Sequence, residues 1–359
     1  MKIKKFFVLY LVLILSALTL CGFVFFYYCG NHGPAKDVNL ATLAANNENL
    51  ETAPTTQDQD VSVIFVGDIM LSRGVAQKIK EHNDYNYPFL KIGDYLKSAD
   101  FVFGNLETSL IKGRETSSGE MVFRADPELA DVLKSFGFAV VSLANNHTMN
   151  FGKAALENTL ITLLKAGVEY AGAGSSALEA YNPGIIEKNG ISFAFLAYTD
   201  SDVVPVSYFA TATTAGVALM DINKMAEAVK LAKQRADLVI VSMHSGIEYK
   251  DYPNNRQTNF ARAAVTAGAD LVIGHHPHVV QTAEIYQGKY IFYSLGNFIF
   301  DQQWWKTKEG IALKIIFNKQ GVKRIEPQAI YIEDFSQPTL LSGEAARKVI
   351  SRLGIVLNQ

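Results

Sequence analysis

The chain has 359 residues and a formal net charge of −2, and 49% of its residues are hydrophobic. This length is sufficient for a full hydrophobic core, and the balanced charge argues against a nucleic-acid partner because no stripe of Lys and Arg with interleaved aromatic residues appears. Both cysteines, Cys21 and Cys29, lie near the N-terminus. We therefore expect no disulfide in the remainder of the chain, whose stability must come from its core.

The N-terminus has the pattern of a membrane anchor. Three lysines at positions 2, 4 and 5 precede an uncharged apolar run from Phe6 to Cys29, which as a helix could cross a hydrocarbon layer of about 30 Å. A cleavable signal peptide usually has a shorter apolar region, of about 7–15 residues, so we favour a signal anchor and keep a removed signal peptide as the alternative. The lysines favour a cytoplasmic N-terminus. The expected protein is thus a single-pass cell-membrane protein with segments 1–5 cytoplasmic, 6–29 transmembrane, 30–60 flexible linker, 61–335 extracytoplasmic domain, and 336–359 C-terminal tail with a helix.

Beyond residue 60, apolar strand-like runs alternate with helical patterns. Strands are predicted over 61–66, 100–103, 139–143, 168–172, 238–243, 269–273, 311–317 and 329–332. Helices are predicted over 75–81, 126–136, 153–165, 221–235, 255–267 and 341–353. Asn189-Gly190 and Gln287-Gly288 are typical of hairpin turns. This alternation predicts an α/β layered fold with one central sheet or two packed sheets.

Polar residues follow five of these buried strands directly. They are Asp68, Asn105 with Glu107, Asn146 with His147, His244, and His276 with His278. In α/β folds the carboxyl ends of parallel strands converge on one crevice, where ligands bind. We therefore expect these carboxylates, amides and imidazoles to form a single site.

The histidine cluster Gly274-His275-His276-Pro277-His278 is the most distinctive motif. In an extended conformation His276 and His278 would point to the same side, and His275 to the opposite side. His276 and His278 could then bind one metal ion together. Taken alone, the motif could also be a polar turn with incidental histidines.

The donor set contains no thiolate, which suits Mn, Fe or Zn in a site of one or two ions. Asp68 or Glu107 could bridge two ions, and an amide oxygen and three imidazoles would complete the ligand set, namely Asn146, His244, His276 and His278. The candidate catalytic residues are His147, as a general acid or base or an oxyanion donor, with Glu107 and Arg73. Residues expected around the ligands or the substrate are Asn105, Glu248, Ser294 and Asn297. Arg73 and Glu248 could instead form structural ion pairs, and Trp304-Trp305 could be part of the core or a substrate platform.

Several motifs occur together in the order found in one protein family. They are Gly67-Asp68-Ile69-Met70-Leu71, Gly104-Asn105-Leu106-Glu107, Ala144-Asn145-Asn146-His147, His244 with Glu248-Tyr249, His276-Pro277-His278, and Ser294-Leu295-Gly296-Asn297-Phe298. From about Val63 to Phe300 the chain resembles the CapA family of poly-γ-glutamate capsule biosynthesis proteins, which have a calcineurin-like metallophosphatase fold. The resemblance implies a four-layer α/β/β/α sandwich with metal at the strand ends.

The chain departs from the family pattern at three positions. Met70 stands where metallophosphoesterases have a metal-binding histidine, which puts one ion in doubt. Asn150 and Ser245 stand where the CapA pattern usually has Asp and Trp. These changes alter the surroundings of the expected site.

By resemblance, the protein acts in the synthesis, export or attachment of an anionic capsule polymer, poly-γ-glutamate, as a metal-dependent hydrolase or transferase. Its expected partners are this polymer, the membrane, and other membrane subunits of a polymer synthase or export complex. Two alternatives stay open at this point. The protein could be a surface metallophosphoesterase, or a non-catalytic subunit of a polymer export complex.

Overall fold

The structure is a computed structural model that describes residues 60–357. The expected cytoplasmic segment, the anchor and the linker up to residue 59 lie outside this range. Within residues 60–357, no helix combines the length and apolar character needed to cross a membrane.

The first of two large sheets contains eight strands, and its centre is parallel. The strand order is β18-β17-β16-β1-β2-β5-β6, and β15 pairs with β1. Strands β15, β1, β2, β5 and β6 run parallel, whereas β16, β17 and β18 form an antiparallel extension. The extension carries the sheet past residue 335. The bounds are β1 Val61–Ile69, β2 Phe101–Leu106, β5 Phe138–Ser142, β6 Glu169–Ala171, β15 Asn297–Ile299, β16 Glu309–Asn318, β17 Gly321–Glu333 and β18 Gln337–Leu340.

The second sheet contains six strands in the order β13-β14-β12-β11-β9-β8. Their bounds are β8 Gly184–Lys188, β9 Ile191–Thr199, β11 Leu238–His244, β12 Leu271–His275, β13 Ala283–Tyr286 and β14 Lys289–Phe292. The four inner strands are parallel, and each outer strand is joined to its neighbour by a hairpin. Both predicted hairpin turns are confirmed, since Asn189-Gly190 and Gln287-Gly288 each have two consecutive positive φ angles, as a type I′ turn requires.

The helices and short elements connect these strands. The helices are α2 Arg73–His82, α3 Gly93–Leu96, α4 Leu129–Ser135, α5 Gly152–Lys165, α6 Ala177–Ala180, α7 Ile222–Ala232, α8 Asn255–Ala267 and α9 Gly343–Ile350. Two-residue strands pair as β3 (Ser109–Leu110) with β4 (Arg124–Ala125) and as β7 (Ala173–Gly174) with β10 (Gly216–Val217). The 3-10 turns are η2 Tyr87–Phe89, η3 Val206–Tyr208, η4 Trp305–Lys308 and η5 Ser351–Leu353.

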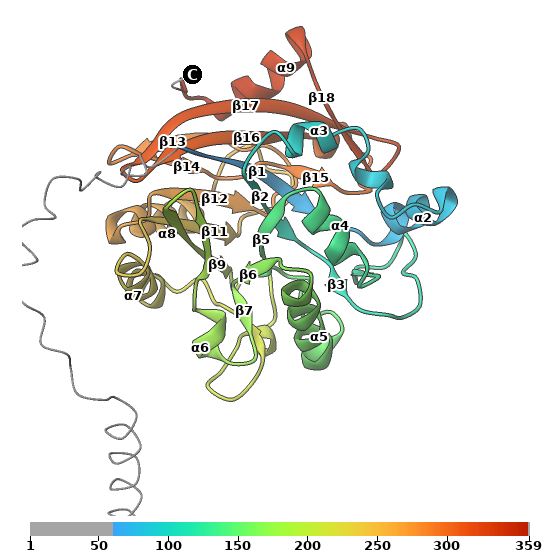
Figure 1. Cartoon of the computed structure of the whole chain (residues 1–359), viewed down its shortest axis with the longest axis horizontal. Helices are drawn as coiled ribbons and strands as arrows, with labels where there is room; N and C mark the ends of the chain where they lie inside the picture. Colours follow the sequence, from blue (N-terminus) through green and yellow to red (C-terminus); the bar gives the residue numbers. More distant parts are fainter. Residues whose placement is uncertain (1–59, 358–359) are drawn as a thin grey trace, which may run out of the picture. The chain divides into compact units, whose positions relative to one another are not determined.

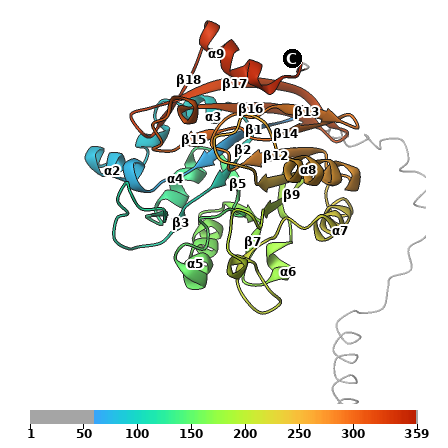
Figure 2. The ribbon, with the colours of Figure 1, turned by 180° about the vertical axis from the view of Figure 1, so that it is seen from behind.

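The strands and helices of the domain are arranged in layers (Figures 1 and 2), and three apolar clusters fill the spaces between them. One cluster lies between the two sheets and includes Phe103 of β2 and Phe195 of β9, whose rings stack with centroids 5.2 Å apart. A second joins the outer face of the first sheet to α2, α4 and α5. The third joins the outer face of the second sheet to α7 and α8. The predicted layered α/β fold is confirmed, with two packed sheets between two layers of helices.

Each sheet buries one face against its partner and the other against helices, which explains its sequence. Strands buried on both faces read as continuous apolar runs rather than as alternating patterns. In β11 all seven residues are buried, and β1 is buried at eight of its nine positions. Consequently, the polar residues at the ends of these strands stand out from their surroundings.

Candidate metal centre

Strand register brings the predicted site residues next to one another. Asp68 of β1 is the parallel neighbour of both Asn105 in β2 and Asn297 in β15. In the second sheet, His244 at the end of β11 is the neighbour of His275 at the end of β12. The carboxyl ends of the two sheets therefore supply the site jointly, as the convergence of parallel strand ends predicts.

The first sheet contributes a buried pair of carboxylates held by an amide. Asn105 Nδ2 donates to Asp68 Oδ1 at 2.8 Å and to Glu107 Oε1 at 2.9 Å. The same nitrogen lies 3.2 Å from His244 Nδ1. Asn145 Nδ2 donates to Asn105 Oδ1 at 3.1 Å, which fixes the orientation of the amide. Asp68, Glu107 and Asn105 are fully buried.

The turn after β5 positions Asn146 and His147. The Asn145 side-chain oxygen accepts hydrogen bonds from the backbone N–H groups of His147 and Thr148, both at 3.0 Å. Asn146 Oδ1 lies 3.0 Å from His244 Nε2, so this amide reaches the second sheet. His147 Nδ1 lies 3.0 Å from Asn150 Oδ1, and the His147 ring stacks on Phe123.

The histidine cluster reaches the site by a different geometry from the predicted one. The expectation from strand alternation is wrong, because β12 ends at His275 and both later histidines have positive φ angles, +97° at His276 and +58° at His278. This left-handed turn places their ring centroids 5.9 Å apart. The expectation that His275 points away from the site is also wrong, since its Nδ1 lies 3.2 Å from Asp68 Oδ1.

Two clusters of side chains have donor atoms close enough to hold a metal ion. One consists of Asp68, Glu107 and His244, and the other of Glu248, His276 and His278. Within each cluster, one donor atom from every residue lies within 4.8 Å of the others. Asp68 lies between the clusters, because its Oδ2 is 3.3 Å from His278 Nδ1.

Burial and neighbouring charges displace the pKa values of these groups. Burial, together with the charge of Asp68, raises the pKa of Glu107 well above its ordinary value. Burial also acts to raise the pKa of Asp68, but hydrogen bonds and charge from His275 and His278 hold it well below its ordinary value. The two neighbouring carboxyl groups therefore have pKa values shifted in opposite directions, up for Glu107 and down for Asp68.

Most of the histidines are held neutral. Burial lowers the pKa of His276 to about 3 and that of His147 to about 4, and it lowers the pKa of His244 well below its ordinary value. In His278 the Asp68 carboxylate outweighs burial and raises the pKa. Neutral imidazoles have a free lone pair, which is the form that binds a metal ion.

These residues fit a divalent metal. Among residues 60–357, Glu107 Oε2 and His276 Nδ1 are buried side-chain atoms without a hydrogen-bond partner. Burying an unpaired polar atom is costly, and a cation bound in each cluster would satisfy these atoms. A cation would also stabilise two carboxyl groups that lie close together without an adjacent Lys or Arg in their hydrogen-bond network. The donor set of carboxylates and imidazoles without thiolates suits a transition metal.

Glu248 and Met70 affect how many donors are available for one or two metal ions. Glu248, which we expected near the ligands, belongs to the second cluster itself. Met70, which departs from the pattern expected by resemblance, is buried, and its sulfur accepts a hydrogen bond from the Ser72 backbone N–H at 3.1 Å. Glu248 therefore adds a carboxylate to the candidate donors, whereas Met70 offers neither a carboxylate nor an imidazole beside Asp68.

Three other predicted residues lie around the clusters. Asn297 Oδ1 is 2.9 Å from His278 Nδ1 and holds that ring in place. The Ser294 hydroxyl accepts a hydrogen bond from the Gly296 N–H, in the turn that leads to Asn297. Arg73 forms an ion pair with Asp301 and lies over the Phe123 ring that also contacts His147.

Sequence reasoning missed Asp200 and its partners. Asp200 directly follows β9, is buried, and forms hydrogen bonds with Ser245 and Arg256. Its backbone N–H donates to the His244 carbonyl at 3.0 Å, so it borders the site. The strand-end rule that identified the other residues would have found it. Together with Glu248 and Asn146, it lines a cleft that opens beside His276.

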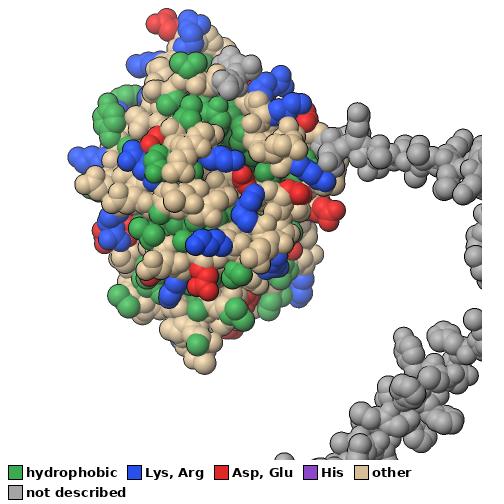
Figure 3. All heavy atoms as spheres, turned by 90° about the vertical axis from the view of Figure 1, so that its left-hand side faces the viewer, with side chains coloured by type: hydrophobic (Ala, Val, Ile, Leu, Met, Phe, Trp, Pro, Cys, Tyr) green, Lys and Arg blue, Asp and Glu red, His purple; other side chains and the backbone are tan. Residues whose placement is uncertain are grey.

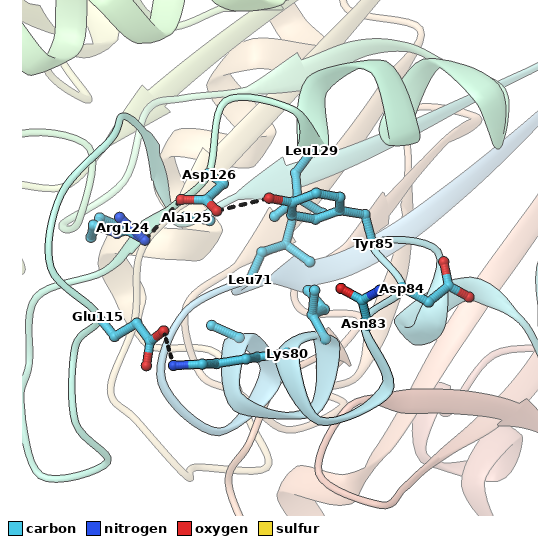
Figure 4. A pocket seen from close by; sticks show the side chains of 12 residues that line it. Leu71, Lys80, Asn83, Asp84, Tyr85, Glu115, Arg124, Ala125, Asp126 and Leu129 are labelled. Atoms are coloured by element: carbon cyan, nitrogen blue, oxygen red, sulfur yellow. Dashed lines mark hydrogen bonds and ion pairs between the residues drawn. The ribbon is translucent and has the colours of Figure 1, made fainter.

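A separate pocket beside α2 is a weaker candidate (Figure 4). Five of its polar side chains are paired with one another: Tyr85 donates to Asp126, Lys80 pairs with Glu115, and Arg124 also pairs with Asp126. It contains none of the metal-ligand candidates. The chemistry of the domain is therefore concentrated at the strand ends.

Comparison with known proteins places the chain in a family. Residues 62–302 match the model of the bacterial capsule synthesis protein PGA_cap. The chain is 35% identical to the PGA biosynthesis protein CapA of Bacillus subtilis, covering 87% of this chain and 82% of that protein. It is 31% identical to the capsule biosynthesis protein CapA of Bacillus anthracis, covering 87% and 77%.

The chain also aligns with a solved structure, the sulfate thiohydrolase SoxB of Termus thermophilus, over 82% of this chain and 60% of that one, at 12% identity and a TM-score of 0.43. The family match covers every ligand candidate from Asp68 to His278. The chain therefore belongs to the family of bacterial capsule synthesis proteins and is CapA-like.

Proposed function

We propose that the protein is a metal-dependent hydrolase or transferase that acts on poly-γ-glutamate during its synthesis, export or attachment. The observation that carries the proposal is the pair of carboxylate–histidine clusters at facing strand ends, in a chain of the capsule synthesis family. The layered α/β/β/α arrangement with donors at these ends supports a fold of the metallophosphoesterase type. Manganese, iron or zinc would suit the donors, as one ion or two.

Residues at the strand ends of both sheets would hold the metal ions. Asp68, Glu107 and His244 would hold one ion, and Glu248, His276 and His278 the other, with Asn146 Oδ1 as a further ligand. Bound ions of this kind lower the pKa of water and polarise a carbonyl or phosphoryl oxygen. Asn297 and Asn105 would keep the ligands in position, as outer partners of metal sites commonly do.

His147 is suited to proton transfer at the edge of this centre. Asn150 Oδ1 accepts the Phe123 backbone N–H, so it presents an acceptor to His147 Nδ1. The proton of the neutral imidazole is thereby placed on Nδ1, which leaves Nε2 free to accept a proton. Because its pKa is lowered to about 4, His147 is neutral at physiological pH and would act first as a base or hydrogen-bond acceptor.

A nucleic-acid substrate is not supported. On the face shown in Figure 3, basic side chains are scattered among acidic and apolar ones and form no continuous stripe. The sequence as a whole carries a formal net charge of −2. Nucleic-acid binding normally requires a concentrated basic surface.

We further propose that the domain acts outside the cell, tethered by the apolar segment 6–29. The three lysines before this segment favour a cytoplasmic N-terminus and a translocated domain. Partner subunits of a membrane synthase or export complex would then have access to the domain from the same membrane.

The proposal is tested with the full chain in a capsule-producing bacterium that lacks its own CapA. His147→Ala and Glu107→Ala should each abolish or severely reduce extracellular polymer at unchanged protein levels, measured by immunoblot and by polymer assay. His82→Ala is the matched control, because His82 is an exposed histidine that stacks on Tyr87 away from the site. A catalytic role fails if both site variants still support full polymer production.

The same variants separate the competing functions in vitro. Turnover of simple phosphate esters that disappears in His147→Ala would favour a surface phosphoesterase. Polymer binding without any turnover in the parent would favour a non-catalytic subunit of an export complex.

A further inference from the structure

A row of aromatic rings, each in contact with the next, extends from the candidate metal centre to the protein surface. The ring centroid of His278 lies 6.3 Å from that of Tyr249, Tyr249 lies 5.9 Å from Trp304, and Trp304 lies 6.1 Å from Trp305. Tyr249, Trp304 and Trp305, which we call the aromatic platform, are 43%, 43% and 49% exposed. Large aromatic side chains that stay exposed together commonly mark contact sites, since they combine apolar area with a polar edge.

Cationic side chains surround the outer end of this platform. Lys306 Nζ, Lys348 Nζ and Arg352 Cζ all lie within 5.9 Å of the Trp305 ring centroid. Lys306 is paired with Asp251, and Arg352 with Glu309. Over residues 60–357, Lys348 has no carboxylate within ion-pair distance, so its charge remains available to an anionic ligand.

The platform is tied to the metal centre through one asparagine. Asn297 Oδ1 contacts the ligand candidate His278, while its Nδ2 donates to the Thr307 carbonyl at 2.9 Å and to Gln302 Oε1 at 3.1 Å. Gln302 Nε2 in turn donates to the Tyr249 hydroxyl at 3.3 Å. These hydrogen bonds therefore fix the position of the segment that carries the tryptophans relative to His278.

A salt bridge joins the two loops of the platform. Lys306 follows the tryptophans, Asp251 follows Tyr249, and their charged atoms lie 2.6 Å apart. Gln281 also stabilises the loop that carries Tyr249, because its Nε2 donates to the carbonyls of Lys250 and Tyr252. A surface that is ordered before binding loses little conformational entropy when a ligand arrives.

We propose that the aromatic platform is a binding subsite for an anionic, amide-linked polymer, and that it holds the segment next to the bond placed at the metal centre. Methylene groups of the polymer would lie on the rings, and its carboxylates would pair with Lys348 beside Trp305. This inference rests on the proposed function, since it names the substrate surface of the same site.

Tryptophan, tyrosine and lysine are also enriched where proteins meet a membrane surface. The continuous ring contacts from Trp305 back to His278 favour the polymer, because a membrane-facing patch would have no need of a connection to the metal centre. Binding to an anionic membrane surface is therefore tested as the alternative in the experiment below.

The protein contains its own reporter for the experiment, since Trp304 and Trp305 are the two tryptophans of the sequence. Poly-γ-glutamate added to the full chain in detergent should change tryptophan emission in a saturable manner, and added salt should weaken the effect. Affinity is measured separately, by fluorescence anisotropy of labelled polymer. Trp305→Ala should weaken binding about tenfold, and Lys348→Gln less but with a smaller salt dependence.

Two matched controls use the same residue types elsewhere. Phe335→Ala removes an exposed aromatic ring from the β17–β18 turn, and Lys230→Gln removes a charge from α7; neither should change polymer affinity. His147→Ala should keep full affinity while losing turnover. Binding and catalysis can thereby be distinguished.

Three results would overturn the inference. Equal polymer affinity in the parent, Trp305→Ala and Lys348→Gln would reject the platform and leave the proposed function intact. A parent that binds no polymer would reject both. A blue shift of tryptophan emission in nanodiscs containing phosphatidylglycerol, without polymer and absent in zwitterionic nanodiscs, would assign the platform to the membrane surface instead.

Discussion

Two carboxyl groups share one buried environment in this domain and ionise differently. Asp68 has imidazoles beside it that stabilise its charge, whereas Glu107 has Asp68 beside it and no cationic side chain. In the metal-free protein the pKa of Glu107 is therefore raised, and a bound cation beside it would lower that pKa.

Glu107→Gln tests this description at the residue level. Because Gln resembles the neutral acid in shape, the metal-free variant should match the parent in thermal stability near pH 4, below the unfolded pKa of a glutamate side chain, while metal content measured by mass spectrometry should fall strongly. Glu284→Gln, which changes a carboxylate on β13, is the control. Unchanged metal content in Glu107→Gln would contradict the assignment of Glu107 as a ligand.

The pH dependence of the metal-free protein follows from the same shift. A carboxyl group whose pKa is raised by folding holds its proton in the folded state after the unfolded state has released it. Stability is thus fully present below the unfolded pKa, about 4.3, and is lost as pH rises through the folded pKa. Thermal melts of the chelated parent should show this loss, and those of Glu107→Gln should show less of it.

At the level of elements, the close approach of β1 to the segment before β15 positions Asp68. Gly67 permits this approach, because a Cβ atom at that position would lie 1.8 Å from the Gly296 carbonyl oxygen. The neighbouring Asp68 N–H donates to the same oxygen at 3.1 Å. Backbone contact, rather than side-chain packing, therefore sets the position of the first carboxylate.

Gly67→Ala should consequently separate these segments. We expect a loss of at least about 2 kcal/mol in the free energy of unfolding, measured by denaturant titration, and weaker metal binding. Gly119→Ala is the control, since no atom lies within 4 Å of the corresponding Cβ in its exposed loop. Equal stability of the two variants would show that the β1–β15 contact can relax.

At the level of the whole molecule, the site exists only while the two sheets remain packed. Asp68 and Glu107 come from one sheet, and His244 and His276 from the other. The apolar layer between them therefore fixes the distance between the two halves of the site. Phe195 in β9 stacks on Phe103 in β2 within this layer.

Phe195→Ala should destabilise the fold by about 3–5 kcal/mol and weaken metal affinity although every ligand is retained. Phe89→Ala is the matched control, because Phe89 packs against Phe136 on the outer, helical side of the first sheet. Calorimetric metal titration below the unfolding range distinguishes the two. A similar loss of affinity in both variants would indicate general destabilisation rather than the spacing of the sheets.

The sequence alone determined which residues would meet, because their position relative to buried strands is a local pattern. Apolar runs followed by Asp68, His244 or the Asn145-Asn146 turn identified strand ends, and the two Asn-Gly and Gln-Gly turns identified hairpins. Family motifs then linked these ends to one site. Pairs as short as β3 with β4 were not predicted, since two residues carry no periodic signal.

Only the tertiary structure decided how the donors are oriented. His276 and His278 adopt left-handed conformations that no alternation rule anticipates, and His275 of the second sheet lies beside Asp68 of the first. The placement of Glu248 among the ligand candidates and the row of aromatic rings to Trp305 depend on contacts between loops far apart in the sequence. Strand periodicity acts over neighbouring residues, whereas donor orientation is set by packing between sheets.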